Sequence, residues 1–234
     1  MDPRIVLGLT LVALPIAFNV LFTTLARIFE YPDILRHEPA EVLTRFVAGG
    51  RRLILVWWAF MLTALAMVPL AALLAAELAP AAPTLAMLSL ALGVSAGLTQ
   101  ALGLARWPFL VPVIAGRYAA TDDDAERTAL TVVFEAAHRF LGVAVGEHLG
   151  YLLTGAWTGV VGLALISSSS GSDILGWLGV LLGLALALGS LEFVGRSGSR
   201  GWSVAEKAVP FAYLGWSVWL LALGVTFLLD LHVA

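Results

Sequence analysis

Cysteine is absent from this chain of 234 residues, and charged residues make up only 12 % of it. Without a thiol, the chain can form no disulfide, zinc–thiolate or iron–sulfur site, and it has no cysteine nucleophile. A soluble domain carries about a quarter charged residues, so the polar surface that a soluble fold of this length needs is missing. These shortages exclude a cytosolic enzyme, a secreted domain and a disordered chain. Long basic runs are also missing, and the net charge of −3 gives no case for nucleic acid as a partner.

Apolar residues are what the chain has in excess: they make up 60 % of it and form long uncharged runs. A membrane-spanning helix needs about 20 such residues. The runs predict an all-α integral membrane bundle of six transmembrane helices, built as a single polytopic domain over residues 1–234 within the lipid bilayer. The predicted spans cover approximately residues 5–28, 53–77, 84–105, 142–167, 174–194 and 207–230. A further run at 107–116 is too short to cross, and its two prolines leave open whether it is interfacial or part of a kinked helix.

The distribution of basic residues between the loops predicts the orientation. Twelve of the 13 basic residues lie in or beside the loops that follow the first, third and fifth spans. They are Arg27, Arg36, Arg45, Arg51, Arg52, Arg106, Arg117, Arg127, Arg139, Arg196, Arg200 and Lys207. Only Arg4 lies on the other side. The positive-inside rule therefore predicts that these three loops are cytoplasmic and that the N-terminus and C-terminus are both outside.

The first of these loops has the pattern of a short helix. Pro39 suits a first helical position, and Gly49 and Gly50 suit a helix end. The apolar residues between them share one face, which predicts a cytoplasmic interfacial helix in the loop between the first two spans. This helix is either a connector that covers the end of the bundle or a gate or docking element, and the sequence leaves both open.

The helix that contains the fourth span is expected to begin at three adjacent aspartates, at 122–124. Such a cluster either holds magnesium on a substrate phosphate or caps the start of a helix, where a carboxylate accepts from free backbone amides. A helix from Asp124 to Ile166 would be roughly 60 Å long, about twice the membrane thickness. It must therefore project, lie along the interface, or break near Gly142 or Gly146. Gly142, Gly146 and Gly150 recur every four residues and predict a ridge that another helix can approach closely.

Unusual polar residues within the spans are predicted to lie at one depth, within roughly 15 Å of the cytoplasmic boundary. They are Asn19, Gln100, Glu147, His148, Tyr151, Glu192 and Tyr213. Ionisable groups at such a depth are costly and usually face the bundle interior or a wet cavity. One interpretation is a ligand-binding pocket in the cytoplasmic half of the bundle. The other is a set of hydrogen bonds that join the helices.

A metal site is a further interpretation of the same helix. Glu135 and His138 have the i, i+3 spacing that carboxylate-bridged di-metal bundles use, and Glu147 and His148 follow on the same helix. Such bundles use two copies of this motif, and only one copy is present here. The two histidines lie about 15 Å apart along a regular helix, too far to bind one ion together unless the helix breaks. The sequence therefore identifies no cofactor.

Three segments are distinctive together: residues 29–36 (FEYPDILR), residues 106–112 (RWPFLVP), and His138-Arg139 with residues 146–151 (GEHLGY). In these segments the chain resembles an uncharacterised, domain-of-unknown-function family of bacterial polytopic inner-membrane proteins. The resemblance covers nearly the whole chain. It implies a multi-pass protein of the bacterial inner (cytoplasmic) membrane, and it implies neither a mechanism nor any functional residues.

Three hypotheses about function follow. The first is binding or transport of a small ligand through the polar pocket. The second is a structural or regulatory membrane subunit with no ligand, in which the polar layer joins the helices. The third is a membrane-embedded metal-dependent enzyme. The sequence leaves open whether the protein is an enzyme, whether its partner is a small molecule or a membrane protein, and its oligomeric state.

Overall fold

The computed structural model describes residues 2–167, 173–194 and 202–230, and this part of the chain is helical and contains no strand. Within these described ranges, six helical stretches are long and apolar enough to cross a membrane. They are Pro3–Phe29, Pro39–Leu78, Pro83–Ala120, Asp124–Ser167, Asp173–Phe193 and Val204–Leu229. The all-α class and the six apolar helices are confirmed, and they fit a multi-pass membrane protein.

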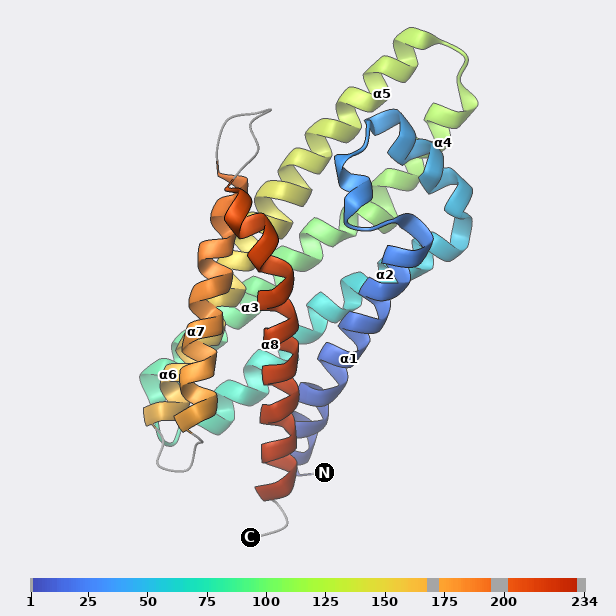
Figure 1. Ribbon diagram of the computed structural model, residues 1–234. Helices are drawn as coiled ribbons and strands as arrows, with labels where there is room; N and C mark the ends of the chain where they lie inside the picture. Colours follow the sequence, from blue (N-terminus) through green and yellow to red (C-terminus); the bar gives the residue numbers. More distant parts are fainter. Residues whose placement is uncertain (1, 168–172, 195–201, 231–234) are drawn as a thin grey trace.

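The six stretches run back and forth along the bundle, and both termini lie at the same end (Figure 1). The first two helices are α1 (Pro3–Phe29) and α2 (Pro39–Leu78), with the 3₁₀ turn η1 (Asp33–Arg36) between them. The last two are α7 (Asp173–Gly189) and α8 (Ser203–Asp230), with the 3₁₀ turn η4 (Ser190–Phe193) between them. We call the end of the bundle opposite the termini, which carries η1 and η4, the distal end.

The stretch at 107–116 is part of a kinked helix. Helix α3 (Pro83–Ala105) continues through a π-helical turn, η2 (Arg106–Leu110), into α4 (Val111–Ala120). Pro108 lies inside η2, and a proline within a helix removes one backbone hydrogen bond and displaces the preceding turn. Trp107 and Pro108 are buried. Of the two alternatives for residues 107–116, an interfacial segment or part of a kinked helix, the structure has the second.

The fourth long stretch combines α5 (Asp124–Ala137), a π-helical segment η3 (His138–Leu149), and α6 (Gly150–Ser167). The Asp123 side chain accepts a hydrogen bond of 2.9 Å from the Ala125 amide, so the aspartates include a helix cap. Helix α5 projects at the distal end (Figure 1). The helix changes to π geometry over a segment that contains both Gly142 and Gly146, where a break is one of the three alternatives that the sequence leaves open.

The glycine ridge lies against α3. A Cβ atom on Gly146 would be 3.1 Å from the Gly103 Cα atom, and one on Gly150 would be 2.8 Å from the Gln100 side chain. The close helix approach predicted from the four-residue spacing is therefore present. It brings η3, with its ionisable residues, directly against the end of α3 and the turn η2.

The helix at 39–49 packs on the distal end of the bundle. Val42, Leu43 and Phe46 are buried there, and Phe46 packs against Trp107 with ring centroids 5.9 Å apart. This helix joins the apolar part of α2 through a kink at Gly50, whose φ of 55° and ψ of −154° suit a residue without a side chain. The packing fits the connector interpretation. Whether this helix lies in a membrane interface stays a prediction, as does the assignment of the distal end to the cytoplasm.

Most basic residues in the described part of the chain belong to the distal end. Arg196 and Arg200, which the orientation prediction also counts, lie outside the described residues. Near the termini, Arg4 forms an ion pair of 2.8 Å with Glu77, which joins the start of α1 to the end of α2.

Candidate functional site

Three of the seven polar residues named from the sequence join helices through hydrogen bonds. Asn19 Nδ2 donates to Ser217 Oγ at 2.9 Å, which links α1 to α8. Gln100 Nε2 donates to Thr154 Oγ1 at 2.7 Å, which links α3 to α6. His148 Nδ1 donates to the Ser190 carbonyl oxygen at 2.9 Å, which links η3 to η4. These three side chains each have a hydrogen-bond partner within the bundle.

The other four, Glu147, Tyr151, Glu192 and Tyr213, come together. Glu147 interacts electrostatically with Tyr151, Glu192 and Tyr213. The ring of Tyr151 packs edge-on against Tyr213 at 5.1 Å and lies 5.6 Å from the ring of Phe193. Three parts of the chain that are distant in the sequence, η3 with α6, η4 and α8, thus contribute to one polar cluster.

Two further residues belong to this cluster, and sequence reasoning missed them as site residues. Arg106 and Tyr31 both interact electrostatically with Glu147 and with each other. Tyr31 follows α1, and its ring packs edge-on against Trp57 at 5.0 Å. We use the term polar cluster for the whole set: Tyr31, Arg106, Glu147, Tyr151, Glu192 and Tyr213.

Arg106 is the only buried charged residue in the described part of the chain, with 5 % of its surface exposed. The orientation prediction counts Arg106 in or beside the loop after the third span, and the structure places it in η2, inside the bundle, because the helix continues into α4. The sequence contains a signal for this: uncharged, mostly apolar residues stand on both sides of Arg106, in a long run before it and a run of ten after it. An arginine between two apolar runs is a candidate for the bundle interior as much as for a loop.

Small residues and a π-helical turn create the space for the guanidinium group. A Cβ atom on Gly142 would be 2.7 Å from Arg106 Nη2, so a larger residue there would displace the side chain. The Arg106 Cζ atom lies 5.2 Å from the centre of the Trp107 ring, within the range of a cation–π interaction. The three segments that carry the family resemblance, around Tyr31, Arg106 and Glu147, meet at this site.

The donors of Arg106 are only partly used. Nη1 donates to the Gly103 carbonyl oxygen. Nη2 is 3.4 Å from His138 Nδ1, at the outer limit of a hydrogen bond. Nε is buried and has no hydrogen-bond partner within the described chain. Among the described residues, no carboxylate forms an ion pair with Arg106, although Glu147 is close enough to interact with its charge.

The residues of the metal hypothesis do not form a ligand set. Over the ranges that the structure describes, no three His, Asp or Glu side chains lie close enough to hold a metal ion. Glu135 is exposed. His138 stacks on Phe134 with ring centroids 6.0 Å apart and has the Arg106 guanidinium beside it, and a cation there opposes binding of a second cation.

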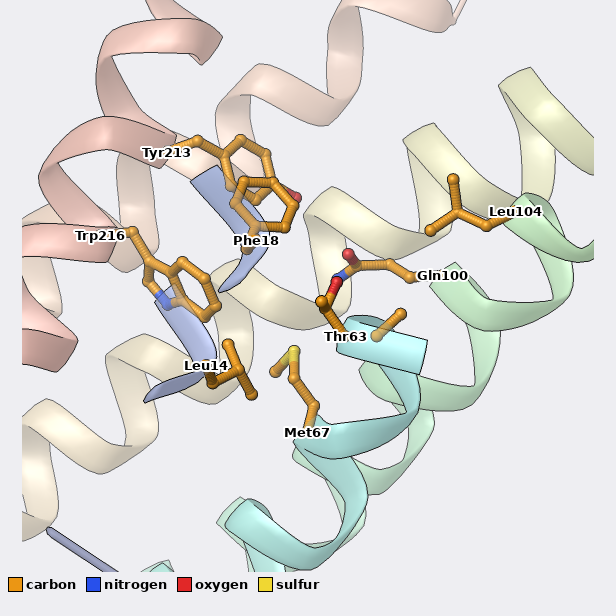
Figure 2. Close-up of a pocket in the computed structure, with 9 residues that line it drawn as sticks. Leu14, Phe18, Thr63, Met67, Gln100, Leu104, Tyr213 and Trp216 are labelled. Carbon is orange, nitrogen blue, oxygen red and sulfur yellow. The ribbon is translucent and has the colours of Figure 1, made fainter. Parts of the chain in front are cut away.

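A narrow pocket opens beside the polar cluster, and Gln100 and Tyr213 are among its lining residues (Figure 2). The lining residues come from α1, α2, α3 and α8: Leu14, Phe18, Thr63, Ala64, Met67, Gln100, Leu104, Tyr213 and Trp216. Tyr213 and Phe18 lie together on one side of it, and their rings stack at 6.2 Å. The free space has room for about one water molecule.

Two ion pairs lie at the distal end, and one of them is next to Glu192 of the cluster. Arg36 of η1 binds Glu206 of α8 at 2.6 Å, and both interact electrostatically with Glu192. Arg45 of α2 binds Glu30 at the end of α1 at 2.5 Å. One pair therefore links η1 to α8, and the other links the end of α1 to α2.

Comparison with known proteins identifies one family. Residues 6–224 match the family described as a domain of unknown function, DUF4386. No curated protein and no solved structure matches the chain. The resemblance to an uncharacterised family, which the three sequence segments indicate, is confirmed. Because the match spans nearly the whole chain, this membrane protein belongs to the DUF4386 family.

Proposed function

We propose that the protein binds a small ligand at the polar cluster and transports it, with the distal half of the bundle as the cytoplasmic half. Arg106 and Glu147 carry the proposal. Ionisable groups inside a membrane bundle are expensive, and they usually mark a substrate, ion or proton pathway. Neither of these two forms a direct ion pair among the described residues, so an ion pair does not explain the cost of burying them.

The local backbone supports the same proposal. Arg106 lies in η2 and Glu147 in η3, and both segments have π-helical geometry. Single π-helical turns within α-helices are frequent at functional sites, because they redirect side chains that a regular helix would leave on another face. The Gly103–Gly146 contact holds η3 against the end of α3, just before η2 begins, and this brings Glu147 near Arg106.

The charge distribution supports the cytoplasmic assignment. Arg27, Arg51, Arg52, Arg117 and Arg139 are exposed residues of the distal half, whereas Arg4 near the termini is paired with Glu77. Short loops rich in Arg and Lys stay in the cytoplasm. With the resemblance of the three segments, this supports a multi-pass location in the bacterial inner membrane with both termini outside.

A structural or regulatory subunit is the second candidate. The hydrogen bonds of Asn19, Gln100 and His148 favour it, because these three side chains act between helices rather than toward a ligand. In this view Arg106 and Glu147 would balance each other's charge at a distance, and the protein would act through a membrane-protein partner.

Native mass spectrometry of the protein in lipid nanodiscs tests the proposal. The wild type is compared with Glu147→Gln, which keeps the shape of the side chain and removes the charge, and with Glu135→Gln as the matched control. Glu135 is exposed on the same long helical stretch and lies outside the polar cluster. We expect a small molecule to be retained by the wild type and by Glu135→Gln, and to be lost from Glu147→Gln.

Thermal unfolding of the same three preparations separates binding from folding. Glu147→Gln should unfold at nearly the wild-type temperature, because Glu147 has no hydrogen bond or ion pair to lose among the described residues. If Glu147→Gln is strongly destabilised and none of the preparations retains a small molecule, the residue is structural and the second candidate should be adopted.

A further inference from the structure

We propose that Arg106 is the anchor for an anionic group of the ligand, a carboxylate or a phosphate. This inference rests on the proposed function and names the chemical class that the same site takes. It starts from the unused donors of a buried guanidinium.

The unused hydrogen-bond donors of Arg106 indicate that the ligand group is an anion. A guanidinium group has five N–H donors in a planar fork and stays charged at any physiological pH. In the described part of the chain Nη1 binds the Gly103 carbonyl, Nη2 makes one long contact with His138, and Nε has no acceptor. A buried donor without an acceptor destabilises the fold, and more so when the group is charged. The group that removes this cost must bring acceptor oxygens.

Glu147 does not supply these oxygens in the structure. Its carboxylate interacts with the charge of Arg106 but forms no hydrogen bond with it. Carboxylates and phosphates match the guanidinium fork with two oxygens at once, which neutral acceptors such as carbonyl groups do not. The ligand group that fits is therefore a two-oxygen anion.

The surroundings favour an organic anion over a simple ion. The Trp107 ring lies beside the guanidinium, and the Tyr31, Tyr151 and Tyr213 rings supply aromatic surface and hydroxyl donors around Glu147. A ligand with one anionic group beside an apolar or aromatic part would meet both the guanidinium and these rings.

The anion has two sources, a soluble metabolite-like carboxylate or phosphate and the headgroup of a lipid. The first arm uses nanodiscs of phosphatidylcholine, titrated with sodium benzoate or with inorganic phosphate at constant ionic strength in sodium chloride. Tryptophan fluorescence is the readout, and Trp107→Phe shows which part of the signal comes from the ring beside Arg106. The second arm uses nanodiscs with phosphatidylglycerol and counts the lipids retained in native mass spectrometry.

The variants are Arg106→Gln, Arg106→Lys and the control Arg117→Gln. Arg117 is exposed on α4, so its loss removes the same charge away from the cluster. Arg106→Lys keeps the buried positive charge but lacks the planar guanidinium that binds two oxygens at once. It replaces Arg106→Gln in the comparison if that variant does not fold. We expect a saturable fluorescence change, or selective retention of phosphatidylglycerol, in the wild type and in Arg117→Gln. In Arg106→Lys the affinity should fall about tenfold or more, the worth of one charge-assisted hydrogen bond.

The outcomes separate this inference from the proposed function. A response to benzoate or phosphate assigns a soluble anion, and selective retention of phosphatidylglycerol assigns a lipid headgroup. The inference is overturned if neither arm responds, or if the response is equal in the wild type and in Arg106→Lys. A small molecule that is lost from Glu147→Gln but kept by Arg106→Lys would show that Arg106 is not the anchor for the ligand. The proposed binding of a ligand at the polar cluster would still hold.

Discussion

Trp57 of α2 and Trp107 of η2 stack face to face, with ring centroids 4.6 Å apart and ring planes 10° apart. Both side chains are fully buried. Phe29, Phe46 and Tyr31 pack around the pair, with ring centroids 5.0–6.2 Å from one tryptophan or the other. This stack lies next to Arg106, so the packing of the distal end and the position of the guanidinium depend on the same two rings.

Replacing Trp57 by alanine should destabilise the protein by about 3 kcal/mol, because the cavity left by a large buried ring is refilled only in part. The neighbouring Trp58→Ala is the matched control, since Trp58 is 45 % exposed on the same helix and faces the outside of the bundle. Equilibrium unfolding in mixed detergent micelles measures both. Equal losses of stability for the two variants would contradict the role given to the stack.

Replacing Gly146 by leucine should prevent stable folding. A Cβ atom there would already meet the Gly103 Cα atom at 3.1 Å and the Leu141 carbonyl oxygen at 3.2 Å, and backbone atoms cannot rotate away. The control is Gly159→Leu on α6, where a Cβ atom would have nothing within 4 Å in the described part of the chain. The measurement is the yield of monodisperse protein on size exclusion, followed by its thermal unfolding. Recovery of Gly146→Leu in the same yield as Gly159→Leu would show that the bundle tolerates a wider separation of these helices.

These contacts show which features of the fold could be predicted from the sequence and which could not. The six apolar helices follow from run length alone, because a span must hide its backbone polar groups over about 20 residues. The ridge of Gly142, Gly146 and Gly150 could also be predicted, since four-residue spacing keeps small residues on one helix face. Which of the polar residues face one another could not be predicted, because helix rotation depends on packing partners that composition does not contain.

Arg106 shows the limit most clearly. An arginine at the end of an apolar run is typical of a loop, and the positive-inside rule counts it so. The π-helical turn that keeps it inside has no signature in the sequence beyond Pro108. Likewise, Asn19 and Glu147 are both polar residues in apolar runs, but Asn19 meets Ser217 while Glu147 meets no direct partner among the described residues. That difference arises from tertiary contacts.

The ion pair between Arg36 and Glu206 should contribute little to stability. The Arg36 side chain is 63 % exposed, and solvent screening limits such a pair to about 0.5 kcal/mol. A double-mutant cycle with Arg36→Ala and Glu206→Ala in detergent should give a coupling energy of this size that falls at high salt. The pair of Arg36 with Asp33, 3.8 Å apart with both side chains largely exposed, should show no measurable coupling. A coupling several times larger would mean that the distal end is held together by the contact between Arg36 and Glu206.

The proposed orientation is tested by labelling single cysteines, which the cysteine-free sequence makes simple. Ala81 lies exposed in the turn between α2 and α3, and Asp122 lies exposed after α4 at the distal end. With the distal end in the cytoplasm, a membrane-impermeant maleimide should label Ala81→Cys in intact bacterial spheroplasts. Asp122→Cys should react only after the membrane is permeabilised, and both should react equally in detergent, which serves as the control for exposure. The opposite pattern would reverse the orientation and move the polar cluster to the outer half of the membrane. The ligand would then reach Arg106 from outside the cell, although the chemistry argued for its anionic group would be unchanged.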